Sequence, residues 1–174
     1  MKTCPFTILV DSAEGQPYTF DGIHCDSPSN DKIWSVSTQY ACLGRHPNGL
    51  GDYSIDGMVG RVHVERKSGE DAVSTILGFS GRRGRFAKEL ENLAKIEAGL
   101  VMIECDVGYL LEGGRRTDWG SSRSRQTIAK QIDGSLLAFM QDFHVPWFFA
   151  MSRRHAEIAT FRFLRRFWKN HHKE

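Results

Sequence analysis

A short segment of the chain combines carboxylates with an amine at a spacing that could support phosphodiester cleavage. Residues 51–71 read GDYSIDGMVGRVHVERKSGED. If the apolar-alternating run here is a strand, Glu65 and Lys67 point to one face and Arg66 to the other, because side chains alternate along a strand. With Asp52 nearby, the acids could bind Mg²⁺ while the lysine positions or activates an attacking water. The alternative is an edge strand whose charges pair with one another in solvent.

The same segment resembles the nuclease domain of the XPF-type structure-specific endonucleases, whose signature is G-D, a spacer and E-R-K-x-x-x-D. All six signature positions hold the matching residue: Gly51, Asp52, Glu65, Arg66, Lys67 and Asp71. Upstream, residues 10–14 (VDSAE) resemble the family's V-D-x-R-E, with Ala13 in place of arginine. Downstream, residues 85–90 (RFAKEL) resemble its R-F-x-x-E-L helix. The resemblance covers most of residues 6–169, including features of the stand-alone versions found in phages and bacteria.

The resemblance implies roles for the signature residues. Asp52 and Glu65 are expected to be the main Mg²⁺ ligands, with the Arg66 carbonyl as a third and Mn²⁺ as a substitute ion. Lys67 is expected to orient or deprotonate the water, and orientation is the safer role because a lysine pKa is ordinarily about 10.4. Asp71 either completes the metal site or stabilises a helix N-terminus, and both roles stay open.

The acids upstream are expected at the edge of the same site. The resemblance implies a direct role for Glu14 and a supporting role for Asp11, although the missing arginine at Ala13 leaves the partner of Glu14 open. Arg66 is expected to point away from the metal, toward a phosphate or a structural acid. His63 is expected to be a packing residue, and the alternative is that it borders the site on the same strand face as Glu65. The expected products are a 5′-phosphate and a 3′-hydroxyl.

Two arginine clusters are candidate DNA contacts, because guanidinium groups and backbone amides bind phosphates well. The first follows two glycines and includes Arg85, the best candidate because it belongs to the R-F-x-x-E-L resemblance: Arg82, Arg83 and Arg85. The second lies in the Gly/Ser/Arg-rich segment 112–125, expected to be a mobile loop in which Trp119 could stack on an unpaired base: Arg115, Arg116 and Arg123. The alternative for each cluster is a solvated charge run.

The net charge of +2 conceals an asymmetry that suits a polyanionic substrate. Residues 1–60 contain three Lys and Arg against seven Asp and Glu, a net charge of −4, whereas the remaining residues carry +6. Positive charge beside an acidic metal site can hold phosphates while the metal offsets the acids. The alternative is that this uneven distribution of charge has no function.

The apolar patterning predicts strands alternating with helices, and hence an α/β sandwich with a mixed sheet. The resemblance implies a restriction-endonuclease-like α/β/α core. Strands are expected at 7–10, 36–43, 54–58, 59–67, 100–104 and 145–150, with a turn or short helix at 15–20. Helices are expected at 71–77, at 83–97 with its end at Gly99, at 124–143, and after a capping Ser152. A single nuclease domain over residues 1–174 is expected, without the helix-hairpin-helix module or the helicase of larger family members.

Bulk properties exclude several classes of protein. With 174 residues, 40% hydrophobic and 25% charged, the chain has the composition of one globular domain. No apolar run approaches the roughly 20 residues of a membrane span. The four cysteines lack C-x-x-C spacing and are expected to be reduced thiols in a cytoplasm, either bacterial or that of a phage-infected host.

These observations together predict a metal-dependent DNA endonuclease that cuts branched or flapped DNA during repair, recombination or replication. Two alternatives remain from the sequence: a non-catalytic DNA-binding or scaffold subunit, and a nuclease of the same fold with another target, such as a four-way-junction resolvase. DNA with a single-strand/double-strand junction is the expected partner, beside a homodimer or an unknown protein partner. The aromatic residues are expected to be core, and the alternative is that some of them form a dimer face: Trp147, Phe148, Phe149, Phe163 and Phe167.

Overall fold

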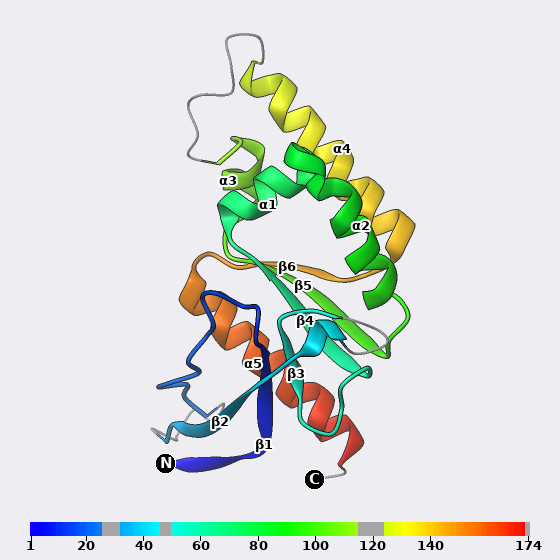
Figure 1. The fold of residues 1–174 in the computed structure, drawn as a ribbon. Helices are drawn as coiled ribbons and strands as arrows, with labels where there is room; N and C mark the ends of the chain where they lie inside the picture. Colours follow the sequence, from blue (N-terminus) through cyan, green and yellow to red (C-terminus); the bar gives the residue numbers. More distant parts are fainter. Residues whose placement is uncertain (26–31, 46–49, 115–123, 173–174) are drawn as a thin grey trace.

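A computed structural model describes residues 1–25, 32–45, 50–114 and 124–172 of the chain. Within these ranges, six strands form one mixed sheet in the order β2-β1-β3-β4-β5-β6 (Figure 1). The strands are β1 (Lys2–Asp11), β2 (Trp34–Ala41), β3 (Tyr53–Ile55), β4 (Val62–Lys67), β5 (Ala98–Ile103) and β6 (Trp147–Phe149). The β1–β3 and β3–β4 pairs are antiparallel, and the other neighbouring pairs are parallel.

Most helices begin at a side chain that caps their first turn. They are α1 (Gly69–Ile76), α2 (Arg82–Leu93), α3 (Val107–Leu111), α4 (Arg125–Phe143) and α5 (Arg153–His171), with short 3₁₀ turns η1 (Leu43–Arg45) and η2 (Phe79–Gly81). Ser68, Ser124 and Ser152 each accept a backbone N–H three residues further on, at the starts of α1, α4 and α5. Asp106 does the same for α3. None of the described helices is both long and apolar enough to cross a bilayer.

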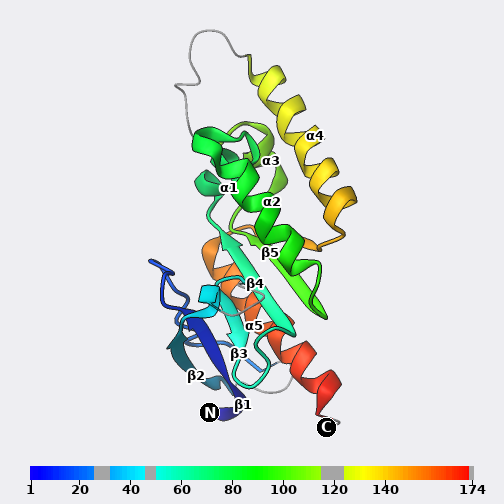
Figure 2. The ribbon, with the colours of Figure 1, turned by 45° about the vertical axis from the view of Figure 1, so that its right-hand side comes forward.

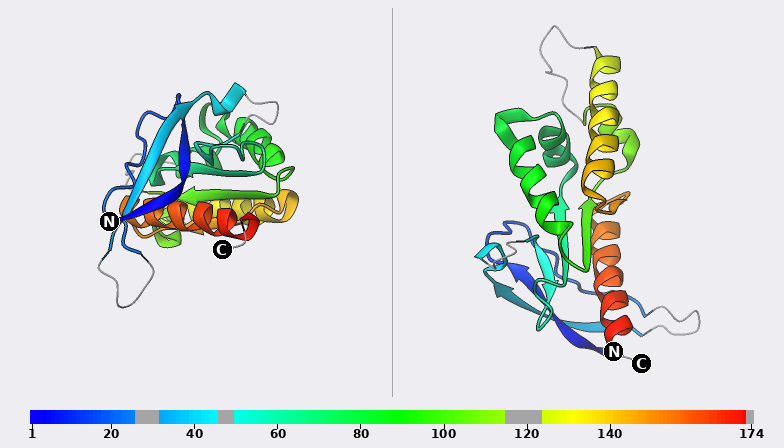
Figure 3. Two further views of the ribbon diagram at one scale, coloured as in Figure 1. Left: turned by 90° about the horizontal axis from the view of Figure 1, so that it is seen from below. Right: turned by 90° about the vertical axis from the view of Figure 1, so that its right-hand side faces the viewer.

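Helices cover both faces of the sheet, as the sequence predicts for an α/β/α sandwich. Figure 3 shows α2 on one side of β4 and β5 and α5 on the other. The α5 side has a core that includes Val64, Met102 and Phe161, and the opposite side one that includes Val101 and Phe86. On that second side, α1, α2 and α4 contact one another and group at one end of the molecule (Figure 2).

The element predictions hold best where the periodicity is long. The helices predicted at 71–77 and 124–143 and after Ser152 are present within two residues of their predicted bounds. The second helix ends at Leu93 rather than at 97, because the chain turns there to start β5. Gly99 was therefore wrongly assigned as the helix end; it lies in β5, where a Cβ would come within 2.8 Å of the Leu93 carbonyl oxygen.

Shorter elements were predicted less accurately. Of the turn or short helix predicted at 15–20, the structure has no helix, only a bend at residues 15–16. Helix α3, with only five residues, was missed because it shows no apolar period. The strand predicted at 59–67 begins at Val62, since residues 56–61 form the turn after β3. The loop predicted at 112–125 falls largely outside the described residues.

Candidate active site

Strand β4 divides the central signature residues between the two faces of the sheet, as its alternation predicts. Glu65 and Lys67 project toward α1 and α2, where the Lys67 Nζ donates to Glu65 Oε1 at 2.9 Å. Both residues are buried, at 8% exposure each. Arg66 projects to the other face, toward the start of α5. One strand therefore supplies a buried acid–amine pair on one side and a guanidinium on the other.

Asp52 reaches the same strand because Gly51 allows a close approach of the two backbones. Gly51 has φ +58°, and a Cβ there would lie 2.9 Å from the Val64 carbonyl oxygen. The Asp52 N–H donates to that oxygen at 2.8 Å. The Asp52 Oδ2 then accepts the Arg66 N–H at 2.7 Å. The G-D dipeptide thus positions a carboxylate beside the end of β4.

Asp52 and Glu65 form an electrostatically unfavourable pair. Burial and the charge of Glu65 hold the pKa of Asp52 well above its usual range. Burial also raises the pKa of Glu65, although the Lys67 ammonium opposes that shift. Two enclosed carboxylates that repel each other would be stabilised by a bound cation.

The available donor atoms suit a hard divalent ion. Asp52 and Glu65 offer carboxylate oxygens, which Mg²⁺ and Mn²⁺ prefer. Across the described ranges, no three His, Cys, Asp or Glu side chains form a complete metal-binding group. Mg²⁺ commonly binds through one or two carboxylates and retains water or substrate oxygens as its other ligands. The residues present therefore fit Mg²⁺ as an ion shared with a substrate.

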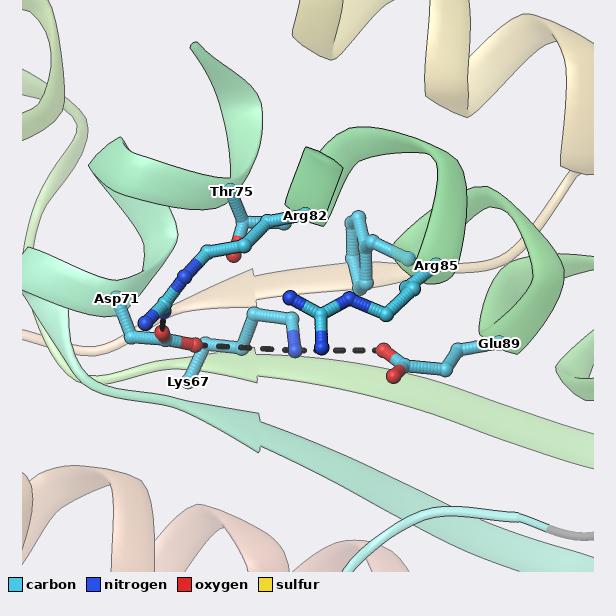
Figure 4. A pocket seen from close by; sticks show the side chains of 7 residues that line it. Lys67, Asp71, Thr75, Arg82, Arg85 and Glu89 are labelled. Carbon is cyan, nitrogen blue, oxygen red and sulfur yellow. Dashed lines mark hydrogen bonds and ion pairs between the residues drawn. The ribbon is translucent and has the colours of Figure 1, made fainter. Parts of the chain in front are cut away.

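Lys67 also lines a pocket of about 220 Å³ between β4 and α2 (Figure 4). Its Nζ lies 3.4 Å from Glu89 Oε2 and 3.9 Å from Asp71 Oδ2, and 4.6 Å from the centre of the Phe86 ring. Burial alone would lower the pKa of Lys67, but the carboxylates of Glu65 and Glu89 raise it above its ordinary value. The lysine is therefore an ammonium ion that faces the pocket.

Asp71 lies in the first turn of α1, where its own N–H donates to the Ser68 hydroxyl. Its carboxylate forms an ion pair with Arg82 and faces Lys67 (Figure 4). Asp71 thus lies in the same pocket as Lys67, and its role as a metal ligand stays a prediction.

On the other face of β4, Arg66 binds structural acids rather than solvent. Its Nε and Nη2 donate to the two oxygens of Glu104 at 2.7 and 2.9 Å. Its Nη1 lies 3.2 Å from both oxygens of Glu14. Arg66 is therefore the partner of Glu14, which the sequence left open. Asp11 accepts the Leu43 N–H at 2.9 Å and so supports the turn after β2.

Two acids of the site were not predicted. Glu104 follows β5, the parallel neighbour of β4, so the pairing of strand ends could have indicated it. Glu89 is four residues after Arg85 on α2, so helical spacing places both on one face. His63 is buried and its Nε2 accepts the Gly60 N–H at 3.0 Å, which agrees with a packing role.

The predicted DNA-contact arginines differ in their surroundings. Arg82 and Arg85 line the pocket with Lys67, and Figure 4 shows both projecting from α2 toward it. Arg83 turns to the other side, where its Nη1 donates to the Ile76 carbonyl at 3.1 Å and to the Ser135 hydroxyl at 2.6 Å. The cluster Arg115, Arg116 and Arg123 and the neighbouring Trp119 lie outside the described residues.

Comparison with known families identifies the domain. A family model described as the ERCC4 domain matches residues 25–161 of the chain. The chain belongs to the ERCC4 domain family. The match contains Asp52, Glu65 and Lys67, whereas Asp11 and Glu14 precede it.

Solved structures agree on the fold of this ERCC4 domain. XPF from Aeropyrum pernix has a TM-score of 0.57 at 14% identity, over 94% of this chain and 65% of that one. The same protein in complex with DNA has a TM-score of 0.60 at 17% identity, over 95% and 66%. The chain therefore spans less than two thirds of those proteins, and the restriction-endonuclease-like α/β fold is confirmed. No curated protein matches it.

Proposed function

We propose that this ERCC4 domain is a metal-dependent endonuclease that hydrolyses phosphodiester bonds in branched or flapped DNA. The observation that carries the proposal is the convergence of Asp52, Glu65 and Lys67 at the end of β4, beside an open pocket lined by arginines. Membership of the ERCC4 family supports a nuclease, and a role in DNA repair or recombination would follow from it.

The donor set assigns separate tasks to the three residues. Asp52 and Glu65 would hold Mg²⁺, or Mn²⁺ in its place, together with the Arg66 carbonyl. Such an ion, when bound, polarises a phosphate oxygen and lowers the pKa of a bound water. Lys67 remains charged and would stabilise the negative charge that develops on the phosphate, while also orienting the water. The products would carry 5′-phosphate and 3′-hydroxyl ends.

The pocket beside Lys67 would receive the DNA backbone. Arg82 and Arg85 project into it, and arginines bind phosphates in a fixed orientation. The XPF structure solved in complex with DNA supports DNA as the ligand of a domain with this fold. Because backbone contacts read no sequence, recognition of branched DNA would depend on its shape. Contact with DNA would also displace water from the site and strengthen its electrostatics.

A cleavage assay with a matched acid variant tests the proposal. Labelled 3′-flap DNA would be incubated with the protein in Mg²⁺ or in EDTA, beside Glu65→Gln and Glu91→Gln. Glu91 is a suitable control because it is an exposed acid on α2, paired with Lys88. Cutting by the parent and by Glu91→Gln in Mg²⁺, but not by Glu65→Gln, is the expected result.

Two outcomes would contradict this function. Cleavage that persists in Glu65→Gln would reject the site, and tight DNA binding by the parent without cleavage in Mg²⁺ would indicate a non-catalytic DNA-binding subunit. A panel of flap, fork, four-way junction, single strand and duplex would then separate flap cutting from junction resolution. Lys67→Ala should slow single-turnover cleavage more than it weakens DNA binding.

A further inference from the structure

The first turn of α5 is fastened to the candidate active site by one arginine. The Arg153 Nη1 donates to Glu104 Oε1 at 3.0 Å, and its Nη2 donates to the carbonyls of Gln16 and Pro17 at 2.6 and 2.9 Å. Its guanidinium also lies 5.0 Å from the centre of the Tyr18 ring. Figure 1 shows the segment after β1 (blue) beside the start of α5 (orange). Arg153 therefore contacts both that segment and the acid at the end of β5.

Glu104 connects Arg153 to Arg66 of the central strand β4. Its side chain is only 7% exposed and accepts three guanidinium N–H groups, two from Arg66 and one from Arg153. Glu14 binds the remaining terminal nitrogen of Arg66. Two arginines and two glutamates thus balance their charges in one group; the side chains of Arg66, Glu14 and Glu104 are at most 8% exposed, whereas that of Arg153 is 42% exposed. Removal of one member leaves a buried charge uncompensated, so the others must rearrange.

Arg66 links this group to the catalytic face through its backbone. The same residue whose side chain is held by Glu104 donates its N–H to Asp52 Oδ2 at 2.7 Å. A displacement of Arg66 therefore displaces the donor that orients Asp52. Three successive hydrogen bonds of 3.0 Å or less therefore connect Arg153 to Asp52, through Glu104 and Arg66.

We propose that Arg153 is a positioning residue of the candidate active site, which acts through Glu104 and Arg66 to fix the orientation of Asp52. The proposal rests on the endonuclease function proposed above. On this proposal, α5 fixes the orientation of the Asp52 carboxylate, although α5 itself contributes no metal ligand and no residue of the pocket beside Lys67. Precise orientation matters because a displacement of about 1 Å in a reacting group can cost about 100-fold in rate.

The neighbouring arginine provides a matched control. Arg154 donates to Glu157 Oε2 and to the Asp21 carbonyl, both at 2.6 Å, and Glu157 accepts the Phe20 N–H at 2.6 Å. Phe20 has φ +59°, a strained conformation for a bulky residue. Arg154 therefore fastens the same N-terminal segment to the same helix turn, and its exposure is similar, at 45% against 42% for Arg153. It has no contact with Glu104 among its described hydrogen bonds.

The test compares Arg153→Gln, Arg153→Lys and Arg154→Gln by two independent measurements. The first is the hydrogen-exchange rate of the Arg66 backbone amide, followed by NMR in EDTA. Arg153→Gln should raise this rate about tenfold or more, and Arg154→Gln should leave it within about twofold of the parent. Arg153→Lys, which keeps the charge but not the forked geometry, should fall between them.

The second measurement is single-turnover cleavage of the flap DNA at saturating protein and Mg²⁺. Arg153→Gln should lower the rate constant about 10- to 100-fold while changing the DNA dissociation constant by less than about threefold. Equal effects of Arg153→Gln and Arg154→Gln on both measurements would overturn the proposal and leave Arg153 a structural anchor. If the parent protein does not cut DNA, the proposed function fails, and the exchange of the Arg66 amide alone decides the role of Arg153.

Discussion

Replacing Asp52 with asparagine should stabilise the metal-free protein while abolishing metal-dependent cleavage. The amide oxygen can still accept the Arg66 N–H, so the hydrogen bond at 2.7 Å is retained. The substitution removes a charge that is disfavoured by burial and by Glu65. We expect a gain of about 1–2 kcal/mol near neutral pH, which is within the range common for single stabilising substitutions. For a chain of this length that equals an increase of about 2–8 °C in Tm.

The gain should depend on pH in a defined direction. A carboxyl whose folded pKa lies above its unfolded value binds more protons when folded, so it destabilises the protein as pH rises between the two values. The difference in the free energy of unfolding between Asp52→Asn and the parent should therefore be small below about pH 4 and should grow as the pH rises through the weakly acidic range. Above the folded pKa the difference should be constant.

Thermal and urea unfolding in EDTA, from pH 4 to pH 8, would measure this effect. Asp56→Asn is the control, because Asp56 is an exposed acid in the turn after β3. Adding Mg²⁺ at about 100 times its dissociation constant should stabilise the parent and Asp56→Asn by about 2.7 kcal/mol, but not Asp52→Asn. An Asp52→Asn variant that is less stable than the parent in EDTA, or whose gain does not vary with pH, would refute the electrostatic reasoning.

Three further variants test other parts of the structure. Arg85→Ala should weaken DNA binding and reduce the slope of log K against log salt concentration by about one; an unchanged slope would remove Arg85 from the phosphate contacts. Gly51→Ala should lower the free energy of unfolding by about 1–3 kcal/mol, because the φ of Gly51 is positive and the new methyl group would meet the Val64 carbonyl oxygen. Urea unfolding measures this change, and a loss below that range would contradict the argument. Glu157→Ala should lower the free energy of unfolding by about 2–3 kcal/mol, because the Phe20 N–H loses its buried acceptor. Limited proteolysis should then cut the segment after β1 faster than in the parent.

Local pattern was sufficient to predict which side chains of β4 share a face. Alternation alone placed Glu65 and Lys67 together and Arg66 opposite, because the period of a strand is a property of its backbone. The capping serine Ser152 likewise marked a helix start, since a capping side chain acts within three residues. These predictions needed no knowledge of the tertiary structure.

The partners of Arg66 could not be obtained in the same way. Glu104 lies 38 residues further along the chain and Glu14 lies 52 residues earlier, so only the parallel pairing of β4 with β5 and the path after β1 bring them together. Arg83 shows the same difficulty. Its place beside Arg82 suggests a shared role, yet one residue of helical rotation turns it toward Ser135 of α4.

The hydrogen bond between the Phe20 N–H and Glu157 joins residues 137 positions apart, which sets an order on folding during synthesis. At about 5–20 residues per second, Glu157 is made roughly 7–27 s after Phe20. Until then the strained Phe20 and the segment after β1, which carries Glu14, have no anchor on α5. The charge group around Arg66, which includes Arg153 of α5, is therefore completed only after α5 has been made, and a nascent chain that has not yet released α5 from the ribosome has no finished candidate site.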